Sequence, residues 1–196
     1  MNKGRMEAFS DGVITVIITI MVLELRTPEG MDWAALESQM PIFLSYLLSF
    51  VFVGIYWANH HHMFQCVEGI HGGVLWANLH LLFWLSLTPF VTAWMGETHF
   101  APWPVALYGV VLLMSGTAYF ILSRVLLRHH GEDSTFAAAL GSDFKGKISL
   151  VCYTVAIPLA LVRPRAACAS YVAVALTWLV PDRRFERALS GQPRRV

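Results

Sequence analysis

Two polar residues open the first apolar segment of the chain and are candidates for chemistry. Ser10 and Asp11 precede residues 12–23, which are apolar except for two threonines, and segment 6–25 has the length of a bilayer-spanning helix. A carboxylate inside such a span requires a partner or a function. Asp11 is therefore either part of a structural polar cluster or a proton carrier.

One face of this helix carries an apolar stripe that contains a single threonine. The residues on this face are Arg5 at its start, followed by Phe9, Gly12, Val16, Thr19, Ile20 and Leu23. Asp11 points well away from it, and Ser10 lies off it on the other side. The simpler interpretation is a face that contacts lipid or a neighbouring helix. If several copies surround an axis, Val16, Ile20 and Leu23 form apolar rings that constrict a pore.

Three consecutive histidines in a second apolar segment suggest a metal or haem site. His60, His61 and His62 cannot close on one ion from one helix, because successive helical residues point about 100° apart. His62 and Cys66 could supply two ligands, and His80 from the next segment could complete a metal or haem site. A hydrogen-bonded structural cluster is the favoured interpretation, so we expect no metal and no cofactor.

The composition is that of an integral membrane protein with a single membrane domain over residues 1–196. The chain is 56% hydrophobic and 14% charged, with a mean hydropathy of +0.55, whereas soluble domains carry about 25% charged residues. A net charge of +1 gives no reason to expect nucleic-acid binding. No catalytic triad order, paired catalytic carboxylates or phosphate-binding loop is present, so no enzyme is predicted.

Six apolar segments predict an all-α protein with six transmembrane helices. They cover residues 6–25, 42–64, 75–95, 105–127, 148–162 and 166–185. Pro89 should break or bend the third helix. The last two segments are short, and two helices are favoured over a re-entrant hairpin. Residues 26–39 and 128–147 should lie outside the membrane, the latter with room for a surface helix at 136–140.

Six spans place both termini on the same side of the membrane. That side would carry eleven of the fourteen Lys and Arg residues. Basic residues accumulate in cytoplasmic loops, so both termini are predicted to be cytoplasmic.

Three motifs in the first half of the chain resemble those of prokaryotic homologues of transmembrane protein 175, a lysosomal potassium channel. They are Arg5-x3-Phe9-Ser10-Asp11-Gly12, Trp57-Ala-Asn-His60-His61-His-Met-Phe64, and Asn78 followed by Pro89-Phe90. The second half of the chain matches this family only in hydropathy and segment number.

The resemblance implies a potassium-selective homotetramer in a bacterial-type inner membrane, with the first helix lining the pore. Val16 would form the narrowest ring, with Thr19, Ile20 and Leu23 beyond it. Apolar rings make ions shed water, which potassium does more easily than sodium, so no carbonyl filter is needed. The resemblance also implies a polar cluster that holds the pore helix in place, drawn from Ser10, Asp11, Trp57, His60, His61 and Asn78.

Two other functions are compatible with these residues. A secondary or proton-coupled transporter would use Asp11 with His60 and His61, although the inverted repeats typical of many transporters are absent. A haem-binding membrane electron carrier would use the histidines as axial ligands and would show a haem absorbance band.

Overall fold

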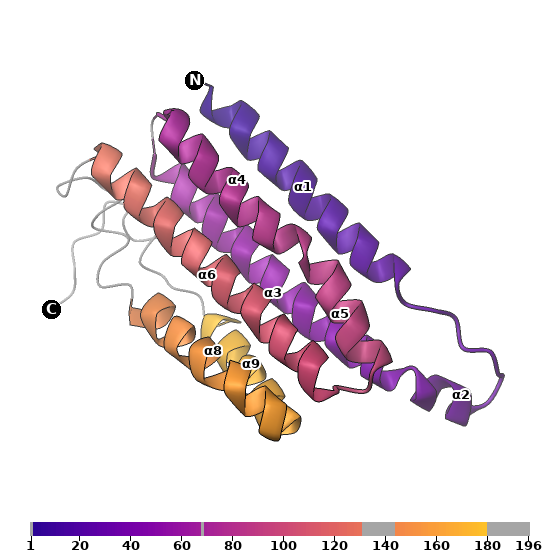
Figure 1. Ribbon diagram of the computed structural model, residues 1–196. Helices are drawn as coiled ribbons and strands as arrows, with labels where there is room; N and C mark the ends of the chain where they lie inside the picture. Colours follow the sequence, from indigo (N-terminus) through magenta and orange to yellow (C-terminus); the bar gives the residue numbers. More distant parts are fainter. Residues whose placement is uncertain (1, 68, 131–143, 180–196) are drawn as a thin grey trace, which may run out of the picture.

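The protein is a bundle of long helices that lie side by side (Figure 1). The computed structural model describes residues 2–67, 69–130 and 144–179, without the side chains of residues 129 and 130. Every regular element in these residues is an α-helix. The helices are α1 (Lys3–Leu23), α2 (Trp33–Ser38), α3 (Met40–Gln65), α4 (Gly72–Ser86), α5 (Thr88–Glu97), α6 (Pro102–His130), α8 (Phe144–Val162) and α9 (Pro164–Leu179).

Five stretches of the described chain are long and apolar enough to cross a membrane. They are Lys3–Leu23, Met40–Gln65, Gly72–Glu97, Pro102–Arg128 and Phe144–Val162. They correspond to the first five predicted spans, and the fifth begins four residues earlier than expected. α9 is not among these five stretches. The predicted continuation of the last helix to residue 185, and the surface helix at 136–140, lie outside the described residues.

The third span is broken where the sequence predicted a break. α4 ends at Ser86 and α5 begins at Thr88, so that Pro89 occupies the first turn of the new helix, where its missing N–H leaves no gap. The Thr92 hydroxyl donates to the Thr88 carbonyl oxygen at 2.6 Å, within the first turn of α5.

The segment 26–39, which was predicted to lie outside the membrane, contains the short helix α2, which was not predicted. The Asp32 carboxylate accepts a hydrogen bond from the Ala35 backbone N–H at 3.0 Å and caps the start of α2. The proline and glycine earlier in the segment obscured this helix. At the same end of the bundle, Arg26 pairs with Glu97 at 2.9 Å and ties the segment to α5.

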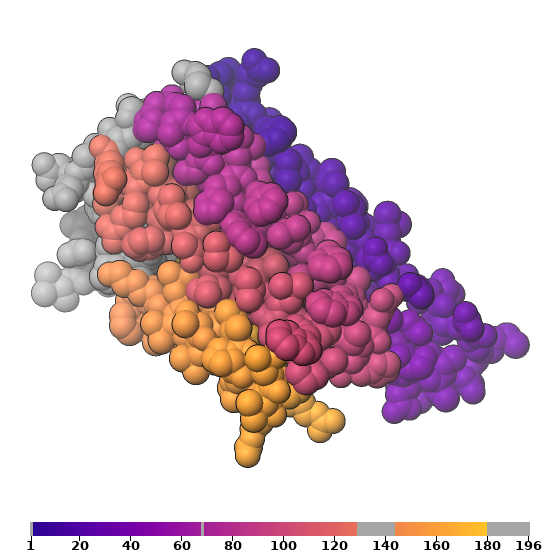
Figure 2. Space-filling view, in the orientation of Figure 1, coloured from indigo at the N-terminus to yellow at the C-terminus, as the bar shows by residue number. Residues whose placement is uncertain are grey.

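The helices pack around two hydrophobic cores. The first lies among α1, α3, α4 and α6, and the second among α3, α5, α6, α8 and α9. α1 packs against α3, α4 and α5, whereas α8 packs against α6 and α9. In the space-filling view of Figure 2, α1 (indigo) and the pair α8 and α9 (orange to yellow) lie along opposite edges of the molecule.

Candidate functional site

One face of α1 is buried in the bundle and the opposite face is exposed. The buried face consists of residues spaced three or four apart, namely Met6, Ser10, Ile14, Ile17 and Met21. All seven members of the predicted stripe are on the exposed side. The fractional exposures of Val16, Ile20 and Leu23 are 54%, 42% and 79%. Within one chain, this stripe therefore has no helix packed over it.

Gly12 and Thr19 lie on the same exposed face of α1. A Cβ atom built on Gly12 would meet no other atom within 4 Å. The Thr19 hydroxyl donates to the Val16 carbonyl oxygen of its own helix at 2.8 Å. That hydroxyl can still accept a hydrogen bond, so Thr19 presents an acceptor oxygen between the two apolar side chains of Val16 and Ile20.

A buried hydrogen-bonded chain fixes α1 to the helices behind it. The Asn78 side-chain amide donates to the Ser10 hydroxyl at 2.9 Å, and Asn78 Oδ1 lies 2.8 Å from His60 Nε2. An amide oxygen only accepts, so this arrangement requires the proton on Nε2 of His60. Ser10 in turn donates to the Met6 carbonyl oxygen at 2.9 Å. The three side chains come from α1, α4 and α3 and are all buried.

Asp11 lies outside this buried chain. It is exposed within a single subunit, and its Oδ1 accepts a hydrogen bond from the Trp57 indole N–H at 3.1 Å. Trp57 stacks on the His61 ring with the ring centroids 5.9 Å apart. Of the partners expected for Asp11, only Trp57 bonds to it, while His60 and Asn78 connect to Ser10 instead. Neighbouring helical residues point about 100° apart, so Ser10 and Asp11 cannot both enter the same core.

Several structural polar contacts were not anticipated from the sequence. Lys3 Nζ donates to the carbonyl oxygens of Phe64 and Val67 at 2.7 and 2.8 Å, at the C-terminal end of α3. This position favours a cation because the last carbonyl groups of a helix are unpaired and partly negative. The signal in the sequence was only a basic residue near the N-terminus, with nothing to indicate its partner.

A second buried polar cluster joins the middle of α3, α5 and α6. The Ser49 hydroxyl lies 2.7 Å from the Thr92 hydroxyl and 3.0 Å from the Tyr108 hydroxyl. Isolated Ser and Thr residues in apolar spans are typical of contacts between helices. The isolated Ser and Thr residues were therefore the feature of the sequence that could have indicated this cluster.

The described histidines do not assemble a metal site. No group of three or more His, Cys, Asp or Glu side chains in the described part of the chain could hold one ion. His80 Nε2 accepts a hydrogen bond from the Trp84 indole N–H at 3.0 Å. Burial raises the pKa of the Cys66 thiol, with Lys3 opposing the shift, so this thiol is less readily converted to the thiolate that binds metals.

Together these features define a multi-pass α-helical membrane protein in which one largely apolar face of α1 is not covered by other helices of the same chain. The sequence profile described as "Endosomal/lysosomal potassium channel TMEM175" matches residues 5–89. A potassium channel of Chryseobacterium sp. (strain P1-3) is 54% identical over 189 residues, which is 96% of this chain and 98% of that protein. The chain belongs to the TMEM175 potassium channel family.

Two further similarities extend the comparison. A crystal structure of a lysosomal potassium-selective channel TMEM175 homolog from Chamaesiphon minutus matches with a TM-score of 0.78 and 26% identity. The match covers 92% of this chain and 97% of that one. The human protein named endosomal/lysosomal proton channel TMEM175 is 37% identical over 80 residues, which is 35% of this chain but only 16% of the human protein.

Proposed function

We propose that this chain is the subunit of a homotetramer that conducts potassium passively across a bacterial inner membrane. The observation that carries the proposal is the exposed stripe of α1, whose other face is held in the bundle. An unpaired apolar face on a helix with the motif of a potassium channel family supports a pore lining. The similarity to proteins named potassium channels supports the choice of ion.

The proposed constriction consists of the rings of Val16, Ile20 and Leu23. Leu23 follows Val16 by seven positions, so the rings would extend over about 10 Å of the pore at 1.5 Å per residue. Ions that enter such a region must give up part of their hydration shell. Potassium holds its water less tightly than sodium and would pass more readily, without a filter of backbone carbonyl groups. The acceptor oxygen of Thr19 would offer partial replacement for the lost water.

The remaining contacts of α1 would keep this face directed toward the axis. The Ser10–Asn78–His60 chain holds the helix from behind, and Lys3 anchors its first turn to the end of α3. We place Lys3 and both termini in the cytoplasm, with α9 as the sixth span. The positive-inside distribution of basic residues supports that orientation.

The proposal is tested by cysteine accessibility in liposomes that contain only the purified protein. Val16, Ile20 and Leu23 are replaced by cysteine one at a time in a background without native cysteines, and ion flux is driven by voltage. A small water-soluble thiol reagent should block flux at each stripe position. Ile17→Cys is the matched control, because Ile17 lies on the buried face of the same helix. Block at Ile17 with no effect at the stripe would rule out this pore lining.

Proton movement is the second candidate function. It is favoured by the exposed carboxylate of Asp11, and by the human relative that is named a proton channel. Liposomes loaded with a pH-sensitive dye separate the two functions. Potassium conduction predicts that Asp11→Asn keeps its preference for potassium over sodium. Loss of a proton flux in Asp11→Asn, with no potassium flux in the parent, would favour the proton carrier.

A further inference from the structure

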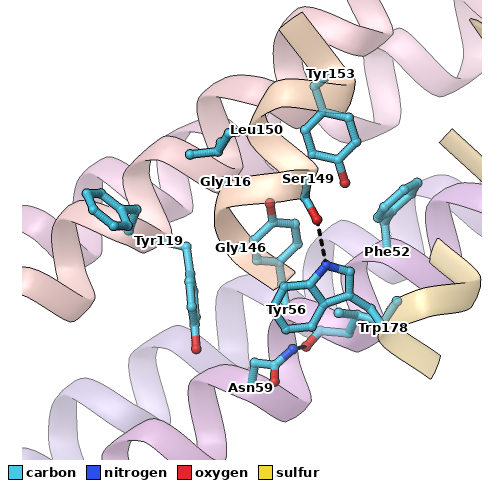
Figure 3. A pocket seen from close by; sticks show the side chains of 12 residues that line it. Phe52, Tyr56, Asn59, Gly116, Tyr119, Gly146, Ser149, Leu150, Tyr153 and Trp178 are labelled. Atoms are coloured by element: carbon cyan, nitrogen blue, oxygen red, sulfur yellow. Dashed lines mark hydrogen bonds between the residues drawn. The ribbon is translucent and has the colours of Figure 1, made fainter. Parts of the chain in front are cut away.

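A pocket lies on the side of the bundle that α1 does not reach. It is formed by α3, α6, α8 and α9 and contains about 510 Å³ of space, part of it open to the outside (Figure 3). Its lining is Phe52, Ile55, Tyr56, Asn59, Gly116, Tyr119, Phe120, Gly146, Ser149, Leu150, Tyr153 and Trp178. Of these four helices α3 also packs against α1, but no residue of α1 lines the pocket, so the pocket is separate from the exposed stripe of α1.

The two ends of the pocket differ in chemistry. Toward the middle of the spans, Phe52 and Tyr153 are buried and pack edge to face, with ring centroids 6.3 Å apart. Toward the helix ends, Asn59 and Ser149 supply polar atoms, and the Trp178 indole donates to the Ser149 hydroxyl at 2.9 Å (Figure 3). Asn59 follows Phe52 by seven positions on α3, so the lining extends over about 10 Å along this helix.

Basic side chains stand at the polar end of the pocket. The guanidinium of Arg124 lies over the ring of Phe120, a lining residue, at 4.9 Å from the ring centroid. Lys147 is exposed in the first turns of α8, next to the lining residue Gly146. No carboxylate lines the pocket among the described residues. Among the described residues, Arg124 and Lys147 therefore add positive charge at this end of the pocket, and the start of α8 adds the positive end of a helix dipole.

The lining of this pocket is mostly apolar, which is unfavourable for water. Water takes up about 30 Å³ per molecule in the liquid and needs two to four polar partners, whereas apolar cavities stay dry and bind apolar molecules. We propose that the pocket binds one acyl chain of an anionic phospholipid of the cytoplasmic leaflet. The chain end lies against Phe52 and Leu150, and the phosphate lies between Arg124 and Lys147.

The charge part of the proposal is tested by native mass spectrometry of the delipidated protein. The probes are dioleoyl phosphatidylglycerol and dioleoyl phosphatidylcholine, which have the same acyl chains and differ in headgroup charge. The parent protein should retain phosphatidylglycerol preferentially. The double variant Arg124→Gln/Lys147→Gln should bind it about fivefold more weakly for each charge removed, the effect typical of a basic residue at an anionic lipid surface.

The matched control removes two arginines from the other end of the same helix pair. Arg163→Gln/Arg165→Gln should bind phosphatidylglycerol like the parent, because both residues lie at the junction of α8 and α9, away from the pocket. Equal binding of the two lipids by the parent would overturn the proposal. So would an equal loss in the two double variants, which would indicate a diffuse charge effect.

The acyl part is tested by filling the pocket. Ile55→Trp places a large side chain in it, and Leu47→Trp, at an exposed position on the same helix, is the control. Ile55→Trp should lose most phosphatidylglycerol binding while Leu47→Trp keeps it, with circular dichroism and gel filtration confirming that both fold. If Ile55→Trp retains the lipid, the pocket is filled by the protein itself or by a second copy, and the proposal is wrong.

Discussion

Replacement of Asn78 by leucine tests how strongly the buried polar chain holds α1 in the bundle. The substitution keeps the number and branching of the non-hydrogen side-chain atoms and removes both hydrogen bonds, the one that Asn78 donates to Ser10 and the one that it accepts from His60. Because these partners belong to two other helices, the change affects the contact between α1 and the bundle more than α4 itself.

The size of the effect follows from what each partner loses. His60 Nε2–H is left buried without its acceptor, which costs about 1–3 kcal/mol. Ser10 loses a donor but still donates to the Met6 carbonyl oxygen, so its loss is about 1 kcal/mol. We expect Asn78→Leu to destabilise the subunit by about 2–4 kcal/mol, or about 5–15 °C in melting temperature.

The assay is thermal unfolding in detergent, together with the fraction of assembled protein in gel filtration. Asn59→Leu is the matched control, since Asn59 is half buried and its amide donates only to the Ile55 carbonyl oxygen of its own helix. It should cost less than about 1 kcal/mol. Ser10→Ala combined with Asn78→Leu should cost less than the sum of the single changes, because the two residues share a bond. Equal melting temperatures for Asn78→Leu and Asn59→Leu would refute the role of the chain.

Three further substitutions test the pore, the packing and the anchoring of α1. Val16→Asn should lower the preference for potassium over sodium about tenfold, which corresponds to 1.4 kcal/mol, as measured by reversal potentials under opposed gradients; an unchanged potential would move the selecting ring elsewhere. Gly109→Ala should lower the free energy of unfolding by about 1–3 kcal/mol, because a Cβ at this position would overlap the Tyr171 hydroxyl. Gly54→Ala is the control: a Cβ at Gly54 meets open space, so this variant should not be destabilised in thermal unfolding. Lys3→Met should cost about 1.5–3 kcal/mol by removing two charge-assisted hydrogen bonds to the end of α3, and a melting temperature equal to that of the parent would show that these bonds contribute nothing.

Hydropathy and local chemistry determined the outline of this protein. The apolar runs predicted the first five spans, since a bilayer requires helices whose backbone groups are satisfied internally. Pro89 predicted the break between α4 and α5, because proline cannot continue the hydrogen bonding of the preceding helix. The helical period also placed Val16, Ile20 and Leu23 on one face. These features depend only on residues close together in the chain, so they are readable without the fold.

The tertiary structure decided which faces point inward. In a membrane helix both the lipid-facing and the buried residues are apolar, so periodicity gives the angle between two residues but does not indicate which one is buried. Ser10 and Asp11 show this clearly: both looked like members of one polar cluster, yet packing against α3 and α4 buries Ser10 and leaves Asp11 exposed. The contact of Lys3 with the end of α3, and the pocket between α3, α6, α8 and α9, likewise join segments distant in sequence. No local pattern could specify them.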